Sequence, residues 1–174
     1  MRTLSVTDSL EINVDVLILF DHWGKIVKKP NALCQELARQ THYVCQERCP
    51  KSKTPKIEIS IVFAHDKFVR DLNFKYRNID KPTNVLSFPN ECMSSTNYRD
   101  HFEGTLLGDV VISYETIIKE SENLTKPTIN HSAHMIIHGL LHLFGFDHDT
   151  LSKATEMESF ENKALAAVDF RKFL

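Results

Sequence analysis

The sequence predicts one α+β domain over residues 1–174, with a small mixed sheet of four strands and about five helices. Three observations favour this class. The chain of 174 residues is long enough to bury a core without disulfide bonds. Strand-like and helix-like patterns occur in turn along it, and no internal repeat or linker interrupts them. The pattern leaves the order of the strands open.

Four segments predict the strands. Residues 10–19 alternate apolar and polar side chains, and residues 57–63 are rich in β-branched side chains. Two further segments, residues 84–88 and 106–113, are also typical of strands. The polar stretch 90–104 between them predicts a mobile surface loop.

Five segments space their apolar residues as a helix does. The first follows Pro30 and carries Leu33, Leu37 and Val44, and the last is amphipathic and closes the chain. The predicted helices are residues 31–48, 66–76, 114–121, 127–144 and 151–173.

The overall charge argues against a passive nucleic-acid binder. A net charge of −2 and a pI near 6.5 give no global positive field, although an enzyme with a local basic groove is compatible with them. No segment resembles a signal peptide or reaches the roughly 20 apolar residues that span a bilayer. We therefore expect a cytoplasmic protein with no membrane partner.

The cysteines predict no disulfide framework in a chain of this size. His42, Cys45 and Cys49 share helical spacing, but no second pair of ligands supports a metal site there. Ordinary reduced thiols are expected at all four positions, Cys34, Cys45, Cys49 and Cys92.

The candidate chemistry is concentrated between residues 131 and 148, which hold five of the nine histidines. His138 and His142 are four residues apart, so a helix projects both rings from one face. Gly145 can end that helix and allow the chain to return His148 towards them. Three imidazole ligands with an open fourth position are typical of catalytic zinc, which predicts one zinc ion per chain.

The spacing of these histidines resembles that of the metzincin metalloproteases, so we expect a zincin-like metal helix. In those enzymes a glutamate directly follows the first histidine and acts as the general base. Gly139 occupies this position here. The metal ligands are therefore present without the proteolytic base, which disfavours a peptidase.

His134 lies about one turn before His138 on the same predicted helix. It either supports a metal ligand or contacts substrate, or it is a half-buried structural histidine. A second candidate is Arg77, at the expected end of a helix, where its guanidinium can bind a phosphate while Lys75 and Lys81 add positive charge. The alternative is a surface arginine paired with Asp80.

Residues 138–148 resemble the signature H-G-x-x-H-L-x-G-Y-D-H of the YbeY family of bacterial endoribonucleases and rRNA maturation factors. The one departure is Phe146 in place of tyrosine. Residues 76–89, which include the run Pro-Thr-Asn-Val-Leu-Ser-Phe-Pro, and residues 107–113 resemble two further blocks of that family.

This resemblance implies that His138, His142 and His148 bind zinc and that Arg77 is associated with RNA cleavage. Asp109 matches an acidic position of the family. The implied fold is a single α+β domain with the metal at a cleft. The implied activity is metal-dependent cleavage of single-stranded RNA in 16S rRNA 3′-end maturation and ribosome quality control, with the small ribosomal subunit as partner.

In the mechanism that follows from this reading, zinc lowers the pKa of a bound water towards neutrality, and Arg77 stabilises charge on the phosphate. Asp109 or Asp147 would orient a ligand or the water, although Asp147 also fits a simple turn. Two alternatives stay open: a ribosome assembly factor whose zinc is structural, and a metal-dependent hydrolase of another phosphoester. A cleft made basic by Arg77 and its neighbouring lysines would favour the nuclease.

Overall fold

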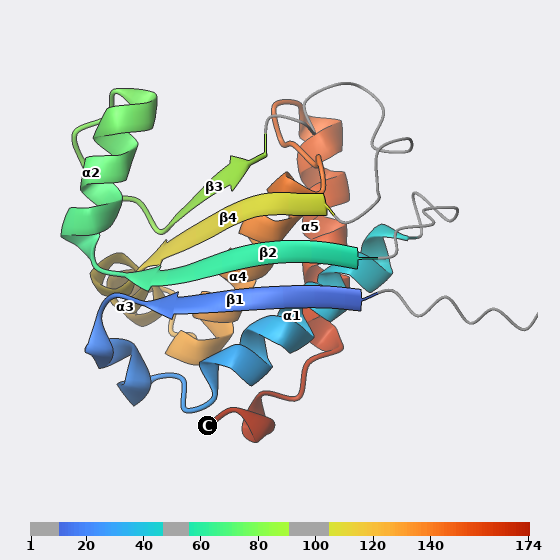
Figure 1. Cartoon of the computed structure of the whole chain (residues 1–174), viewed down its shortest axis with the longest axis horizontal. Coiled ribbons are helices and arrows are strands. Elements are labelled where there is room, and N and C mark those ends of the chain that lie inside the picture. The colour runs from blue at the N-terminus through green and yellow to red at the C-terminus, as the bar shows by residue number, and fades with distance from the viewer. Residues whose placement is uncertain (1–10, 47–55, 91–104) are drawn as a thin grey trace, which may run out of the picture.

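The computed structural model describes residues 11–46, 56–90 and 105–174. Its centre is a four-stranded mixed sheet in the order β1-β2-β4-β3 (Figure 1). The strands β1 (Glu11–Ile18), β2 (Lys56–Ala64) and β4 (Thr105–Ser113) are parallel. The fourth strand, β3 (Val85–Pro89), pairs antiparallel with β4 and forms one edge of the sheet. The predicted α+β class and the mixed four-stranded sheet are confirmed.

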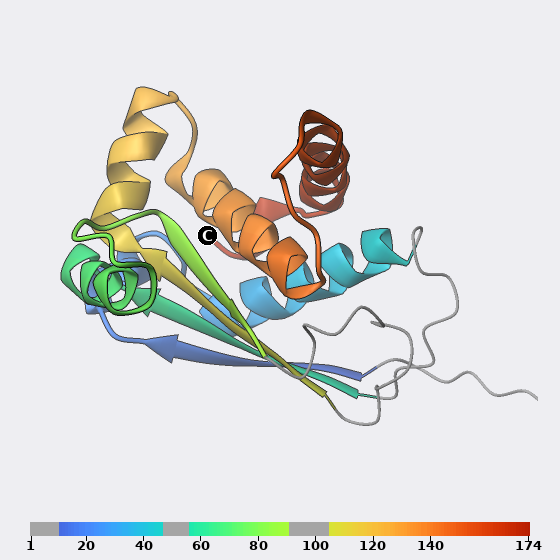
Figure 2. The ribbon, with the colours of Figure 1, turned by 90° about the horizontal axis from the view of Figure 1, so that it is seen from above.

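Two helices, α1 (Pro30–Cys45) and α4 (Thr128–Leu143), cover one face of the sheet, and α5 (Leu151–Ala166) packs on the outer side of these two helices (Figure 2). Their apolar residues and the inward residues of β2 form the main core. Helix α2 (Asp66–Arg77) packs on the opposite face through a smaller cluster around Val69 and Leu86. Helix α3 (Tyr114–Asn123) follows β4 and packs against α4.

The apolar residues of β2 explain why the sheet packs against the main core. Ile57, Ile59, Ile61 and Phe63 alternate along the strand and are fully or almost fully buried. Because alternate side chains of a strand point to opposite faces, these four side chains all enter the main core. Burying each of them contributes about 1.5–3 kcal/mol to folding.

The last predicted helix is shorter than its pattern indicated. Helix α5 ends at Ala166 instead of continuing to residue 173, and a short 3-10 helix, Phe170–Lys172, follows. Val168 and Phe173 are both buried, so the chain turns to bring both side chains into the core. An unpredicted 3-10 helix, Asp21–Lys25, follows β1, and the other predicted elements are present with ends that differ by a few residues.

Cys34 is a buried free thiol, and burial raises its pKa well above the usual range; Cys45 is also buried. Cys49, Cys92 and the predicted loop after Asn90 lie outside the described residues. In the part of the chain that the structure describes, no helix has the length and apolar character needed to cross a membrane.

Candidate metal centre and cleft

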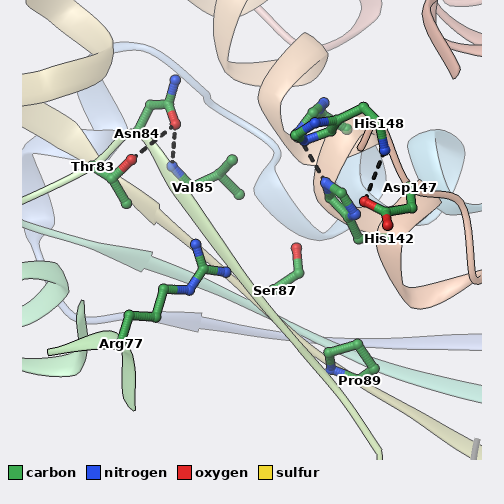
Figure 3. A pocket seen from close by; sticks show the side chains of 10 residues that line it. Arg77, Thr83, Asn84, Val85, Ser87, Pro89, His142, Asp147 and His148 are labelled. Atoms are coloured by element: carbon green, nitrogen blue, oxygen red, sulfur yellow. Dashed lines mark hydrogen bonds between the residues drawn. The ribbon is translucent and has the colours of Figure 1, made fainter. Parts of the chain in front are cut away.

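The structure brings the three predicted histidines together. His138 and His142 lie four residues apart on one face of α4. His148 returns from the following turn to the side of His142 (Figure 3). Their ring centroids are 4.7 Å apart for His138 and His142, 5.5 Å for His138 and His148, and 5.1 Å for His142 and His148. One nitrogen of each ring lies within 4.8 Å of the others, which is compatible with a shared metal ion.

The turn after α4 has the form that Gly145 predicts. Gly145 has a φ of 81°, its N–H donates to the His142 carbonyl, and the Phe146 N–H donates to the Leu141 carbonyl. This is a Schellman motif, in which glycine takes the left-handed conformation without a side-chain penalty. The ring of Phe146 is buried and packs 4.9 Å from that of Phe160. A phenylalanine here therefore provides the apolar contact that anchors the turn.

Hydrogen bonds fix which ring nitrogen of two histidines faces the centre. His138 Nδ1 lies 2.7 Å from Glu161 Oε1, and His142 Nδ1 lies 3.1 Å from the Phe146 carbonyl oxygen. A carboxylate and a carbonyl only accept, so each Nδ1 carries a proton, and in the neutral form of each ring Nε2 presents a lone pair.

The two Nε2 atoms of His138 and His142 face each other at 3.1 Å. Two lone pairs at this distance repel unless a cation lies between them. Two nitrogens bound to one tetrahedral zinc at about 2.0–2.1 Å are themselves about 3.3 Å apart. Burial and the neighbouring His138 and His148 lower the pKa of His142, which favours the neutral form of the ring that can coordinate a metal. The residues present thus fit a bound divalent metal.

Glu161 is the functional carboxylate that the sequence did not reveal. It lies on α5, its side chain is 9% exposed, and it accepts from His138 and, at 2.8 Å, from His134 Nε2. Burial alone would raise its pKa, but the hydrogen bonds and charge of the two histidines lower the pKa of Glu161 to about 2. His134 therefore supports the site through Glu161. The sequence pattern that could have identified Glu161 is its position on the otherwise apolar face formed by Met157, Phe160 and Ala164.

Asp109 does not play the orienting role expected of it. It is exposed on β4 and alternates with Val110, which faces α4, so its side chain points to the other face of the sheet. Asp147 lines the cleft and accepts from the main-chain N–H of His148 at 2.8 Å, so it is a turn residue at the rim.

Gly139 lies where helix and sheet meet most closely. A Cβ at this position would lie 2.7 Å from Val110 Cγ1 and 3.0 Å from Ser87 Oγ. Ser87 Oγ also donates to the Gly139 carbonyl at 3.1 Å, which ties β3 to α4. A glutamate after His138 would therefore require Val110 and Ser87 to move.

The histidines open onto a cleft of about 500 Å³ between α4, β3 and the end of α2. Its charged side chains, apart from the histidines, are Arg77 and Asp147. Lys75 and Lys81 do not line it, so the described cleft lacks the two lysines that would have favoured the nuclease; the Lys75 ammonium lies over the ring of Tyr76. The lining residues are Arg77, Thr83, Asn84, Val85, Ser87, Pro89, His138, His142, Asp147 and His148.

Arg77 is the last residue of α2 and reaches towards the cleft beside β3 (Figure 3). The helix ends because Asn78 takes a left-handed conformation, with φ 57°. The alternative pairing of Arg77 with Asp80 was wrong, since Asp80 accepts two hydrogen bonds from Arg70, at 2.6 and 2.8 Å. Arg77 is thus available to a ligand in the cleft.

A partly buried chain of hydrogen bonds holds the start of β3. Asn84 Oδ1 accepts from the Val85 N–H at 2.7 Å, and Asn84 Nδ2 donates to Glu120 at 3.1 and 3.2 Å. Glu120 also accepts from the buried His131 Nε2, at 2.7 Å. His131 is therefore structural and braces the wall of the cleft.

The fold and the site together define a class of protein: one α+β domain in which three histidines and an arginine face a common cleft. Residues 25–169 match the family model described as Endoribonuclease YbeY, and the chain belongs to this family. An endoribonuclease YbeY of Wolbachia pipientis subsp. Culex pipiens is 40% identical, over 91% of this chain and 96% of its own length.

Two further comparisons agree. An endoribonuclease YbeY of Allorhizobium ampelinum is 34% identical, over 91% of this chain and 92% of its own. A solution structure of a Thermotoga maritima protein superimposes with a TM-score of 0.52 at 18% identity, covering 88% of this chain and 89% of that one. That similarity bears on the fold alone.

Proposed function

We propose that this protein is a zinc-dependent endoribonuclease that cuts single-stranded RNA. The observation that carries the proposal is the convergence of the Nε2 atoms of His138 and His142, at 3.1 Å, in one cleft with Arg77. The family relationship supports cleavage of RNA, since both relatives are described as endoribonucleases.

Each residue then has a defined task. His138, His142 and His148 would hold one zinc ion. A metal in such a site supplies Lewis acidity and lowers the pKa of a bound water towards neutrality. The guanidinium of Arg77 holds a non-bridging oxygen of the phosphodiester and stabilises the charge that develops on it. Glu161 and the Phe146 carbonyl keep two imidazoles in the required tautomer.

The proposed biological role follows from the same family resemblance. The protein would act in the cytoplasm on 16S rRNA 3′-end maturation and ribosome quality control, with the small ribosomal subunit as its partner. The matching blocks at residues 76–89, 107–113 and 138–148 support this role.

The rival with a purely structural zinc needs a fourth protein ligand. Among the described residues, only three histidines form a group with metal-ligand spacing, and His134 is hydrogen-bonded to Glu161. An open fourth position is what catalysis requires, so the geometry favours the enzyme. A hydrolase of another phosphoester is the alternative that predicts metal-loaded protein inert on RNA in the experiment below.

The experiment compares metal content and single-stranded RNA cleavage in four proteins. We expect wild type to hold one zinc and cut RNA, and His142→Ala to lose both properties. Arg77→Ala should keep its metal and lose about 10²-fold or more in cleavage rate. The matched control Arg70→Ala, on the same helix but paired with Asp80, should keep metal and activity. Metal-loaded wild type and Arg77→Ala that are equally inert on RNA would contradict the proposal.

A further inference from the structure

Strand β3 borders the cleft and is an edge strand within the described residues. Three of its residues, Val85, Ser87 and Pro89, line the cleft. An edge strand presents main-chain N–H and C=O groups that no neighbouring strand uses. Which of these groups are free depends on the register between β3 and β4.

The register between β3 and β4 determines whether the main-chain groups of each β3 residue point towards β4 or towards the open edge. The Ser113 N–H donates to the Asn84 carbonyl, and the Asn90 N–H donates to the Leu107 carbonyl. In an antiparallel pair, residues alternate between bonding to the partner strand and pointing away from it. Even-numbered residues of β3 therefore bond to β4, and the main-chain groups of the odd-numbered ones point to the open edge.

Only one N–H on this open edge is left unused in β3. The Val85 N–H already donates to Asn84 Oδ1 at 2.7 Å, and Pro89 has no N–H. Ser87 lies between them, and its hydroxyl is engaged with the Gly139 carbonyl. Its main-chain N–H is thus the remaining donor, on a strand that the sheet holds rigid.

We propose that the main-chain N–H of Ser87 and the guanidinium of Arg77 together form the subsite for a non-bridging oxygen of the scissile phosphodiester. Figure 3 shows Ser87 between Arg77 and the histidines, where a phosphate bound near the metal centre would lie. The N–H donates a hydrogen bond and transfers no proton. Because it is fixed in direction beforehand, it stabilises developing charge without reorganisation. This inference rests on the proposed function.

The same edge disfavours an extended peptide as substrate. A peptide that adds to a sheet edge needs a row of alternating main-chain donors and acceptors. On the open edge of β3, the Val85 N–H is bonded to Asn84 and Pro89 has no N–H, so the Ser87 N–H is the one donor left. A single donor beside an arginine suits a phosphate oxygen.

The N–H can be removed without breaking the ladder, because proline is tolerated at an edge position whose N–H points away from the sheet. Ser87→Pro loses the hydroxyl and the N–H, whereas Ser87→Ala loses only the hydroxyl. We expect Ser87→Pro to have kcat on single-stranded RNA about 10²-fold below that of Ser87→Ala, with equal metal content. Equal kcat in the two variants would overturn the inference.

A matched control tests whether an edge proline is harmful in itself. In β1, the Leu19 N–H bonds to the Phe63 carbonyl, so even-numbered residues face the other open edge of the sheet. Ile18→Pro places a proline at such a position, away from the cleft, and should leave RNA cleavage at the wild-type level.

A second measurement needs no variant. In zinc-loaded wild-type protein, dimethyl phosphate should shift the NMR amide proton resonance of Ser87 downfield. The Val85 amide, already bonded to Asn84, should shift less. An unchanged Ser87 amide at saturating phosphodiester would refute the subsite even if Ser87→Pro fails to fold. A wild type that cuts no RNA, with the Ser87 shift present, would refute the proposed function and leave the phosphodiester subsite standing.

Discussion

At the scale of single residues, Glu161 connects the candidate metal centre to α5, a helix that begins only after His148. It accepts from His138 and His134 at 2.7 and 2.8 Å. By holding Nδ1–H of His138, it directs Nε2 towards the metal position. A carboxylate in this arrangement also makes the imidazole a stronger ligand. Position 139, directly after His138, carries no acidic group, and Glu161 instead places a carboxylate at Nδ1 of the His138 ring.

Glu161→Gln should weaken zinc binding by about 10–100-fold, because the amide is a weaker acceptor and can turn an N–H towards His138. Competition with a chromophoric chelator measures this affinity without RNA. The control Glu158→Gln changes an exposed glutamate of the same helix and should bind zinc as wild type does. Equal affinity in all three proteins would show that Glu161 does not position the ligand.

Glu161 also gives metal-free protein a defined pH dependence. The pKa of its carboxyl is about 2 in the folded protein and near the ordinary 4.5 when unfolded. A lowered folded pKa stabilises the fold above pH 4.5, and this contribution is lost as pH falls from 4.5 towards 2. Chemical denaturation should show wild type losing more stability than Glu161→Gln between pH 5 and pH 3. A parallel loss in both proteins would contradict this.

At the scale of elements, the contact between α4 and β3 depends on Gly139. Alanine in a helix usually stabilises by roughly 0.5–1 kcal/mol relative to glycine. Here the added Cβ would lie 2.7 Å from Val110 Cγ1, closer than atoms approach without rearrangement. Overpacking of this kind costs about 1–3 kcal/mol, which exceeds the stabilisation expected from the helix propensity of alanine.

Gly139→Ala should therefore lower the free energy of unfolding by about 1–2 kcal/mol, measured by denaturant titration. Gly24→Ala is the control, because a Cβ there would meet nothing within 4 Å. A stabilised Gly139→Ala variant would mean that α4 can move away from β3 at little cost.

Local pattern predicted the elements well, and the reasons are visible in their packing. Strand β2 alternates buried isoleucines, and α4 ends at Leu143, two residues before Gly145 takes the expected left-handed conformation. The three-histidine cluster was predicted because its members lie within one helix and one turn. The strand order β1-β2-β4-β3 and the pairing of His138 with Glu161, 23 residues away, depend on tertiary packing that local periodicity does not encode.

At the scale of the whole molecule, the charge distribution sets how the protein can attract RNA. The chain has a net charge of −2, and Arg77 is the one permanently cationic side chain that lines the described cleft. Binding should therefore depend on contacts at the site more than on a long-range field.

The affinity for single-stranded RNA should fall only gently with salt. One neutralised phosphate gives a slope of roughly −0.7 in a plot of log K against log salt concentration. Fluorescence anisotropy between about 50 and 200 mM salt measures this slope. A value steeper than about −3 would show that several more cations bind the RNA backbone.

The most direct test of the central claim is cleavage of a single-stranded RNA before metal removal, after it, and after one equivalent of zinc is returned. We expect cleavage to stop on removal and to recover with one equivalent in wild type, while His142→Ala recovers nothing. Undiminished cleavage by protein shown to be free of metal would contradict the assignment of His138, His142 and His148 as the catalytic metal site.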